Sequence, residues 1–161
     1  MESSRIDPRE LRDALGQFAT GVTVITCYDK AGNAVGMTAS SFNSLSLEPA
    51  LVLWSIGKSS SNFDAFNGCD HFNIHVLKRE QDALAYQFAS KEGDRFANVE
   101  LTRNDSKAPA IENCLARFEC SMHANHDGGD HRLLIGKVEQ LQQNDGEALA
   151  FHRGKFAGLC A

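Results

Sequence analysis

The sequence lacks the marks of an exported or membrane-embedded protein. No apolar run approaches the about 20 residues that a membrane span requires, and residues 1–12 are polar, without the apolar core of a signal peptide. The five cysteines are an odd number with no C-x-x-C pair, so neither a disulfide framework nor a zinc ribbon fits their spacing. We therefore expect free, buried thiols and a cytoplasmic location.

Positive charge and nucleotide-binding loops are scarce as well. Lysine and arginine total 16 against 21 aspartates and glutamates, and this acidic balance excludes general nucleic-acid binding, because backbone phosphates require a basic surface. The chain has no G-x-G-x-x-G or Walker loop, no catalytic triad and no paired carboxylates. Its 42% hydrophobic and 23% charged residues are typical of a folded protein. A length of 161 residues without a repeat or linker predicts one domain over 1–161.

The N-terminal third predicts a helix followed by a β-hairpin. Asp7 and Pro8 form a helix start, and apolar residues at helical spacing carry the helix to Phe18. The β-branched residues 22–26 indicate a strand, and a turn at 29–33 returns the chain through a second strand, 34–41.

Strands outnumber helices in the rest of the chain. Residues 50–56 are a dense apolar run, which predicts a strand buried on both faces. Further strands are expected at 72–77, 116–123, 133–141 and 149–156, with helices ending at Phe66 and covering 79–90. The long irregular loop 91–109 is of a kind that more often carries function than not. This mainly β pattern with a few helices favours an antiparallel barrel or sandwich.

Three polar segments are candidates for ligand binding. Residues 38–41 place three hydroxyls after a strand, residues 58–62 combine a lysine with three serines before a helix, and Arg95 lies beside Phe96. Hydroxyls, amides and a guanidinium suit a phosphate, and an aromatic ring can cover a flat heterocycle. Each segment also has a purely structural interpretation: a solvated turn, an ordinary helix cap, and a surface arginine next to a core phenylalanine.

A cluster of histidines supports two hypotheses. His123, His126 and His131, with Asp127 and Asp130 between the last two, could supply metal ligands, although the spacing matches no standard zinc pattern. Alternatively His131, just after the turn, hydrogen-bonds a ligand or moves protons, unless it is simply a solvated loop histidine.

Taken in order, these segments resemble the short-chain flavin reductases, the reductase components of two-component flavin-dependent monooxygenases. The similarity is carried by residues 18–26, 36–42, 49–62, 72–77, 93–96, 129–131 and 151–156, and so covers nearly the whole chain. It implies an FMN-binding split β-barrel of Greek-key type, flanked by short helices, and usually a homodimer. It also implies hydride transfer from NADH or NADPH to a flavin, with reduced flavin passing to a partner monooxygenase. FMN is favoured over FAD by the short chain, and NADH over NADPH because no arginine cluster awaits a 2′-phosphate.

The resemblance also implies which residues form the site. Those expected to bind flavin are Met37, Thr38, Ala39, Ser40, Ser41, Ser55, Ile56, Lys58, Ser59, Ser60, Ser61, Asn62, Arg95 and Phe96. His131 is expected to orient the nicotinamide and assist proton transfer, with Arg153 and Phe156 also on the nicotinamide side. His152 departs from the family pattern, which commonly has an aromatic residue there. The alternatives are a non-catalytic flavin-binding or storage module of the same fold, and a metal-binding barrel that uses the three histidines.

Overall fold

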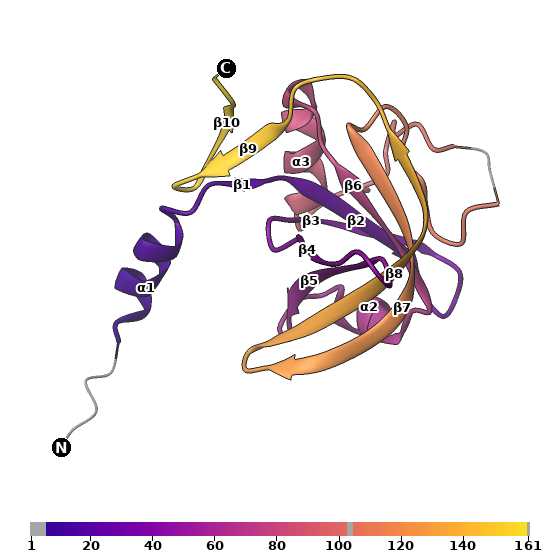
Figure 1. The fold of residues 1–161 in the computed structure, drawn as a ribbon, viewed down its shortest axis with the longest axis horizontal. Helices are drawn as coiled ribbons and strands as arrows, with labels where there is room; N and C mark the ends of the chain where they lie inside the picture. Colours follow the sequence, from indigo (N-terminus) through magenta and orange to yellow (C-terminus); the bar gives the residue numbers. More distant parts are fainter. Residues whose placement is uncertain (1–5, 103–104, 161) are drawn as a thin grey trace.

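The computed structural model describes residues 6–102 and 105–160 (Figure 1). The elements in chain order are α1 (Pro8–Leu15), β1 (Thr20–Gly21), β2 (Thr23–Tyr28), β3 (Ala34–Ala39), β4 (Asn43–Ser46), β5 (Leu51–Gly57), α2 (Phe63–Gly68), β6 (His71–Val76), the 3₁₀ helix η1 (Arg79–Gln81), α3 (Asp82–Ala89), β7 (Ala116–Gly128), β8 (His131–Gln143), β9 (Leu149–His152) and β10 (Lys155–Gly158). No helix among these described residues is long and apolar enough to cross a membrane.

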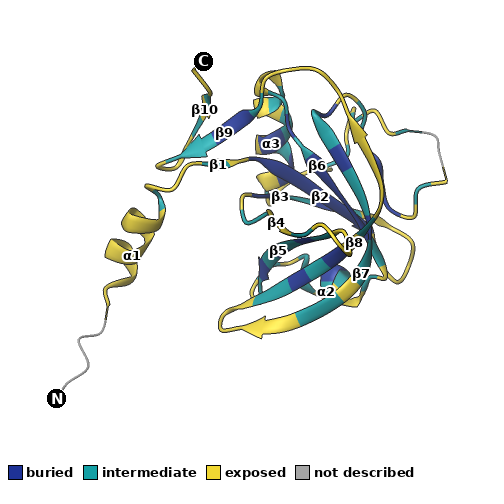
Figure 2. Ribbon diagram, viewed as in Figure 1, coloured by how far each residue is buried: buried dark blue, intermediate teal, exposed yellow. Residues whose placement is uncertain are grey.

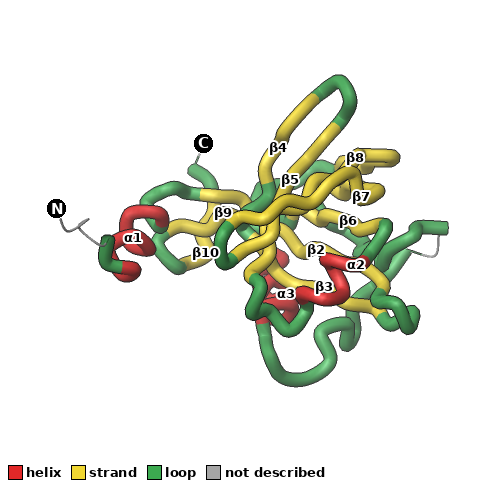
Figure 3. The backbone as a smooth tube through the Cα atoms, turned by 90° about the horizontal axis from the view of Figure 1, so that it is seen from below, coloured by secondary structure: helices red, strands yellow, loops and turns green. Residues whose placement is uncertain are grey.

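Two antiparallel sheets form the scaffold. The larger has seven strands in the order β3-β2-β6-β7-β8-β5-β4, and the smaller has the order β1-β9-β10. The larger sheet curls so that β5 faces β2 and β3 without closing into a complete barrel (Figure 1). Helix α3 packs against β3 and β2, and α2 packs against β2 (Figure 3). The expected mainly β, split-barrel architecture is therefore confirmed.

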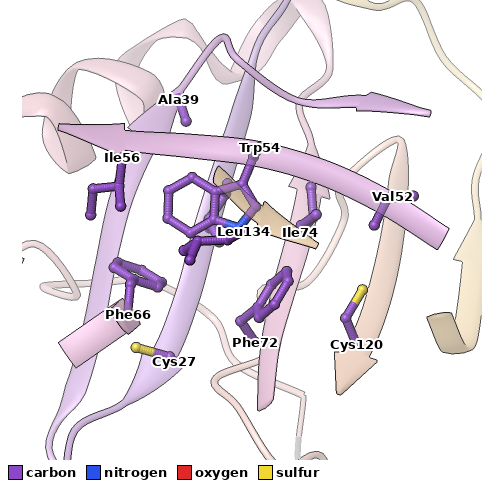
Figure 4. Close-up of a cluster of buried hydrophobic side chains, with 11 residues drawn as sticks. Cys27, Ala39, Val52, Trp54, Ile56, Phe66, Phe72, Ile74, Cys120 and Leu134 are labelled. Carbon is purple, nitrogen blue, oxygen red and sulfur yellow. The ribbon is translucent and has the colours of Figure 1, made fainter. Parts of the chain in front are cut away.

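The main core lies inside the curled sheet (Figure 4). Trp54 of β5 meets Phe66 of α2 edge-on at a ring-centroid distance of 5.0 Å, and Phe72 of β6 lies 6.2 Å from the same indole. Such tilted pairs are favoured by the aromatic quadrupole and add to the large apolar area that each ring buries. A second cluster packs Phe88 of α3 against the start of β2. These two clusters fix α2 and α3 on either side of the loop that follows β5.

The expected N-terminal helix is present and extends away from both sheets (Figures 1 and 2). The carboxylate of Asp7 accepts hydrogen bonds from the backbone N–H groups of Arg9 and Glu10, so the predicted cap is confirmed. None of the residues of α1 is buried, and Leu15 and Phe18 expose 64% and 76% of their surface. The apolar side of this helix therefore lies uncovered in the single chain.

Two expectations about strands are wrong. Residues 149–156 are not one strand but the hairpin β9–β10, because Arg153 and Gly154 both have positive φ, 50° and 77°, as the tightest hairpin turns require. β5 is not buried on both faces. Its burial alternates, with Val52, Trp54 and Ile56 inside, because one face packs on the core while the other is only half covered.

The β6 strand shows why much of the long loop is structural. Its Asn73 amide donates to Ser106 Oγ at 2.9 Å and to the Ala108 carbonyl at 3.0 Å. The fully buried His75 donates through Nδ1 to the Val24 carbonyl at 2.9 Å and accepts at Nε2 from the Ile111 N–H at 3.0 Å. Residues 105–111 therefore cover one face of the sheet, and only the earlier part of the loop lies near the candidate site.

Candidate functional site

A cavity of about 640 Å³ lies beside the outer edge of β3. It is lined by Met37, Thr38, Gly57, Ser59, Ser60, Ser61, Asn62, Phe88, Ala89, Lys91, Arg95 and His131. These residues come from β3, the last residue of β5 with the loop after it, the end of α3 with the loop after it, and the first residue of β8. The fold thus brings together predicted ligand residues from four separate segments, in a volume that suits a small-molecule site.

His131 is placed by strand pairing and by a carboxylate. The register of β5 with β8 sets His131 opposite Gly57, where a Cβ atom would lie 3.6 Å from the imidazole Nε2. Nδ1 lies 2.7 Å from Asp130 Oδ1, and this contact with the imidazole lowers the pKa of the Asp130 carboxyl. Because the carboxylate accepts the Nδ1 proton, a neutral His131 presents Nε2 as an acceptor. The imidazole is therefore oriented to pair with an amide or hydroxyl donor.

The lining of the cavity also includes hydroxyls and two cations, Arg95 and Lys91. Ser59 and Ser61 are exposed in the loop after β5, while Ser60 Oγ accepts from the Asn62 N–H at 3.2 Å and shapes the turn. Arg95 donates to the carbonyl oxygens of Ser90 and Gly36 at 2.7 and 2.9 Å. Both acceptors are uncharged, so the guanidinium keeps its positive charge for an anion.

Lys91 is a lining residue that the sequence analysis missed. It is exposed, directly follows the C-cap of α3 and lies four positions before Arg95, on the same loop. The short spacing between Lys91 and Arg95 could have indicated this residue, since two cations on one short loop suit an anion.

Lys58 is placed differently from the expectation. Its ammonium forms an ion pair with Asp127 near the end of β7, and that pairing lowers the pKa of the Asp127 carboxyl. Its backbone N–H donates to the Asp130 carbonyl at 2.9 Å. The structure therefore shows Lys58 tying the end of β5 to the β7–β8 hairpin, beside His131, and not among the side chains that line the cavity.

The hydroxyl-rich segment 38–41 is largely engaged within the protein. Thr38 Oγ1 donates to the Ala85 carbonyl of α3 at 2.6 Å. Ser41 Oγ donates to the Ser55 carbonyl and accepts from the Ser55 N–H, both at 3.0 Å. Ala39 is buried, and Ser40 lines a separate cavity of about 210 Å³. Ile56 is 1% exposed and belongs to the core, so only Met37 and Thr38 of these residues line the main cavity.

The remaining expected residues lie elsewhere in the single chain. Phe96 packs edge-on against Phe88 at a centroid distance of 5.0 Å and lines a neighbouring cavity. Phe156 lies between Tyr86 and Phe151. Arg153 donates to Gln17 Oε1 at 2.9 and 2.6 Å, in a hollow between the segment after α1 and the β9–β10 turn.

The histidine cluster does not form a metal-binding group in the described residues. The described part of the chain contains no group of three or more His, Cys, Asp or Glu side chains that could hold a metal ion. His123, His126 and His131 lie on the two strands of the β7–β8 hairpin, and His131 pairs with Asp130. The metal-binding interpretation therefore has no geometric support in these residues.

Comparisons with known proteins identify the family of the chain. The family model described as flavin reductase like domain matches residues 15–159. The chain is 47% identical over 148 residues to FMN reductase (NADH) SmoA of Agrobacterium fabrum, which covers 92% of this chain and 84% of that protein. It is 43% identical to the reductase component of the flavin-dependent trigonelline monooxygenase of Acinetobacter baylyi, spanning 92% of this chain but only 48% of that protein.

Solved structures give the same result. The Streptomyces globisporus NADH:FAD oxidoreductase SgcE6, in complex with NAD and FAD fragments, superposes with a TM-score of 0.89 at 34% identity over 98% of both chains. The flavin reductase PheA2 superposes with a TM-score of 0.88 at 34% identity over 97% of this chain and 100% of that chain. The expected family is confirmed by a match over nearly the whole length. The chain belongs to the flavin reductase like domain family.

Proposed function

We propose that this protein is an NAD(P)H:flavin oxidoreductase that passes hydride from a nicotinamide cofactor to FMN or FAD. The observation that carries the proposal is the cavity beside β3, which is lined by an imidazole oriented by Asp130, by exposed serines and by the two cations Lys91 and Arg95. A flavin has the matching arrangement, because its heterocycle and its phosphate are joined by a polar chain. The names of the similar proteins, FMN reductase (NADH) and NADH:FAD oxidoreductase, support the same reaction.

The residues that would hold a flavin follow from their chemistry. Ser59, Ser61 and Asn62 would donate hydrogen bonds to the phosphate, whose charge Lys91 and Arg95 would balance. When bound, the isoalloxazine supplies the hydride-accepting chemistry. The protein contributes position: Met37 and Thr38 would border the ring along β3, where Thr38 is hydrogen-bonded to α3 and Met37 packs against the main core.

His131 is the proposed catalytic residue. Asp130 holds the Nδ1 proton, so Nε2 would accept a hydrogen bond from the carboxamide of the nicotinamide and fix the face from which hydride leaves. A protonated His131 could alternatively give a proton to a ligand at the same position. Arg153 and Phe156 lie outside the cavity of one chain, so their proposed contribution to the nicotinamide side requires a second subunit or a change of conformation.

The proposed partners are a second copy of the chain and a monooxygenase. A homodimer would cover the exposed apolar side of α1, which has no partner surface among the described residues of its own chain. Several similar proteins are named as reductase components or subunits of flavin-dependent monooxygenases, which supports delivery of reduced flavin to such an enzyme. The five cysteines are free thiols, which agrees with a reducing compartment such as the cytoplasm.

The test is steady-state oxidation of NADH or NADPH by the purified protein with FMN, with FAD, or without added flavin. Turnover that depends on flavin is expected, and His131→Ala should lower kcat more than it weakens flavin binding. His126→Ala is the matched control, because it removes an exposed imidazole from the same hairpin. A yellow, flavin-loaded protein that oxidises neither nicotinamide would refute the reductase and establish the flavin-binding module instead.

A further inference from the structure

Two of the five cysteines lie next to each other, although they are far apart in the sequence. Cys27 is near the end of β2, and Cys69 directly follows α2 as its C-cap. The Cys27 thiol donates a hydrogen bond to the Cys69 sulfur. The Cys69 thiol donates in turn to the Phe66 carbonyl at 3.3 Å. The two sulfur atoms are therefore in direct contact.

The packing of α2 on β2 brings the two thiols together. Cys27 belongs to the main core together with Phe66 of α2 (Figure 4), and Cys69 packs against the same cluster. The end of α2 also lies at the turn after β2, because a Cβ atom at Gly68 would be 3.4 Å from Lys30 Cε. These contacts place the two cysteines side by side independently of the hydrogen bond between them.

The two thiols differ in exposure and in acidity. Cys27 is fully buried, whereas Cys69 is only partly buried. A small neutral molecule such as hydrogen peroxide can therefore reach Cys69 first. The hydrogen bond from Cys27 is the main cause that lowers the pKa of the Cys69 thiol, and the same bond raises the pKa of Cys27. Because the thiolate is the nucleophile, Cys69 is the member of the pair that attacks an oxidant.

We propose that Cys27 and Cys69 form a reversible redox pair, which hydrogen peroxide converts to a disulfide. The Cys69 thiolate attacks one peroxide oxygen, the O–O bond breaks, and the departing hydroxide takes up a proton and leaves as water. The Cys27 sulfur then attacks the sulfenic acid of Cys69. An S–S bond forms, the S–O bond breaks, and the Cys27 proton leaves with the second hydroxide as water. Two thiols and one peroxide thus give one disulfide and two waters.

The first step prepares Cys27 for the second. Its pKa is raised chiefly by the hydrogen bond to the Cys69 sulfur, and also by the negative charge on that sulfur. Both causes disappear once the Cys69 sulfur is an uncharged sulfenic acid. The neighbouring thiol can then close the disulfide before a second peroxide carries Cys69 to the irreversible sulfinic acid. Cytosolic disulfides are usually of this transient, redox-sensing kind.

The source of the peroxide rests on the proposed function. Reduced flavin that meets dioxygen before it reaches a partner enzyme passes on two electrons and two protons, which gives oxidised flavin and hydrogen peroxide. The peroxide would form close to the pair, because residues 59–62, which line the proposed flavin cavity, directly precede α2. A thiol reductant restores both cysteines by exchange with the disulfide.

The direct test treats the purified protein with hydrogen peroxide, without flavin or nicotinamide. The protein is then denatured in N-ethylmaleimide, digested with trypsin and mapped by mass spectrometry. Cleavage after lysine and arginine leaves Cys27 in the peptide 13–30 and Cys69 in the peptide 59–78, each with one cysteine. The expected result is these two peptides joined, with a mass two hydrogen atoms below their sum, and separated again by dithiothreitol.

The other cysteines supply the controls. Cys114 and Cys120 are buried and donate to backbone carbonyls, so both should stay reduced. Cys160→Ser removes an exposed thiol outside the pair and should leave the yield of the cross-link within twofold of the wild type. Cys27→Ala should carry Cys69 to the sulfinic acid, because its partner thiol is gone. A wild type that oxidises Cys160 without joining the two peptides, or that forms the Cys69 sulfinic acid while Cys27 stays reduced, would overturn the inference.

A second arm replaces the added peroxide with NADH and FMN in air. Turnover should produce the same cross-link, and catalase should prevent it. A cross-link that forms with added peroxide but not during NADH oxidation would overturn the proposed source. Failure to oxidise NADH or NADPH with either flavin would instead refute the proposed function, and the direct test with peroxide would still decide whether the two cysteines form a redox pair.

Discussion

The buried His75 should make the stability of this protein depend steeply on pH. Burial is the main cause that lowers the pKa of His75 from 6.5 to about 4, and the positive charge of Arg117 acts in the same direction. The hydrogen bond to Val24 opposes this shift. A second proton would sit on Nε2, the atom that accepts from the Ile111 N–H, and would break that bond. The folded state therefore holds the neutral imidazole.

The size and sign follow from the two pKa values. Between pH 6.5 and 4 the unfolded chain binds a proton at His75 that the folded chain does not, so the stabilising contribution is complete above pH 6.5 and falls as the pH drops toward 4. The pKa of His75 falls from 6.5 to about 4 on folding. At about 1.4 kcal/mol per pKa unit, this change corresponds to about 3 kcal/mol of folding stability. This loss is a large part of the free energy of unfolding of a whole domain, which is about 5–15 kcal/mol.

The assay is urea unfolding of the wild type and His75→Gln at a series of pH values from 4 to 7. The variant should be less stable at neutral pH, because the Val24 carbonyl and the Ile111 N–H lose part of their pairing. Its stability should nevertheless fall less than that of the wild type as the pH is lowered. Two parallel curves over this range, or an NMR titration of His75 near its ordinary pKa, would refute the reasoning.

Two further changes test the site and its packing. Lys91→Ala should weaken binding of both FMN and FAD about tenfold, or about 1.4 kcal/mol, because it removes a cation from the lining of the cavity. The exposed Lys155→Ala should leave both affinities unchanged, and titration calorimetry measures the difference. Gly36→Ala should destabilise the fold by about 1–3 kcal/mol in urea unfolding, because the new Cβ would lie 2.5 Å from Phe88. Gly21→Ala, with no atom within 4 Å of the added Cβ, is the control, and equal losses would contradict this account.

Local patterns in the sequence predicted local structure well. The cap of α1 depends on Asp7 and the two N–H groups that follow it, and the turn before β3 depends on Asp29, whose carboxylate accepts from Ala31 and Asn33. These interactions span at most four residues, so the residues that make them are visible side by side. The β9–β10 turn was missed because Arg153, at a positive φ, is not a residue that marks turns.

Contacts between residues far apart in the chain could not be predicted from local sequence patterns. Lys58 was expected at a phosphate because its neighbours are serines, yet it is neutralised by Asp127, 69 positions away. The register of β5 with β8 brings Gly57 opposite His131, and through the hairpin places Asp127 beside Lys58. No local signal specifies this register, since it depends on which faces of both strands pack into the core.

The hydroxyl-rich segment 38–41 can shape a ligand site without its hydroxyls facing the ligand. Thr38 fastens β3 to α3, and Ser41 fastens the chain beyond β3 to Ser55 of β5. β3 has no room for a side chain at Gly36, because an added Cβ there would lie 2.5 Å from Phe88 of α3. These contacts hold Met37 and Thr38 at the border of the cavity, where Lys91, Arg95 and His131 supply charge and hydrogen bonding.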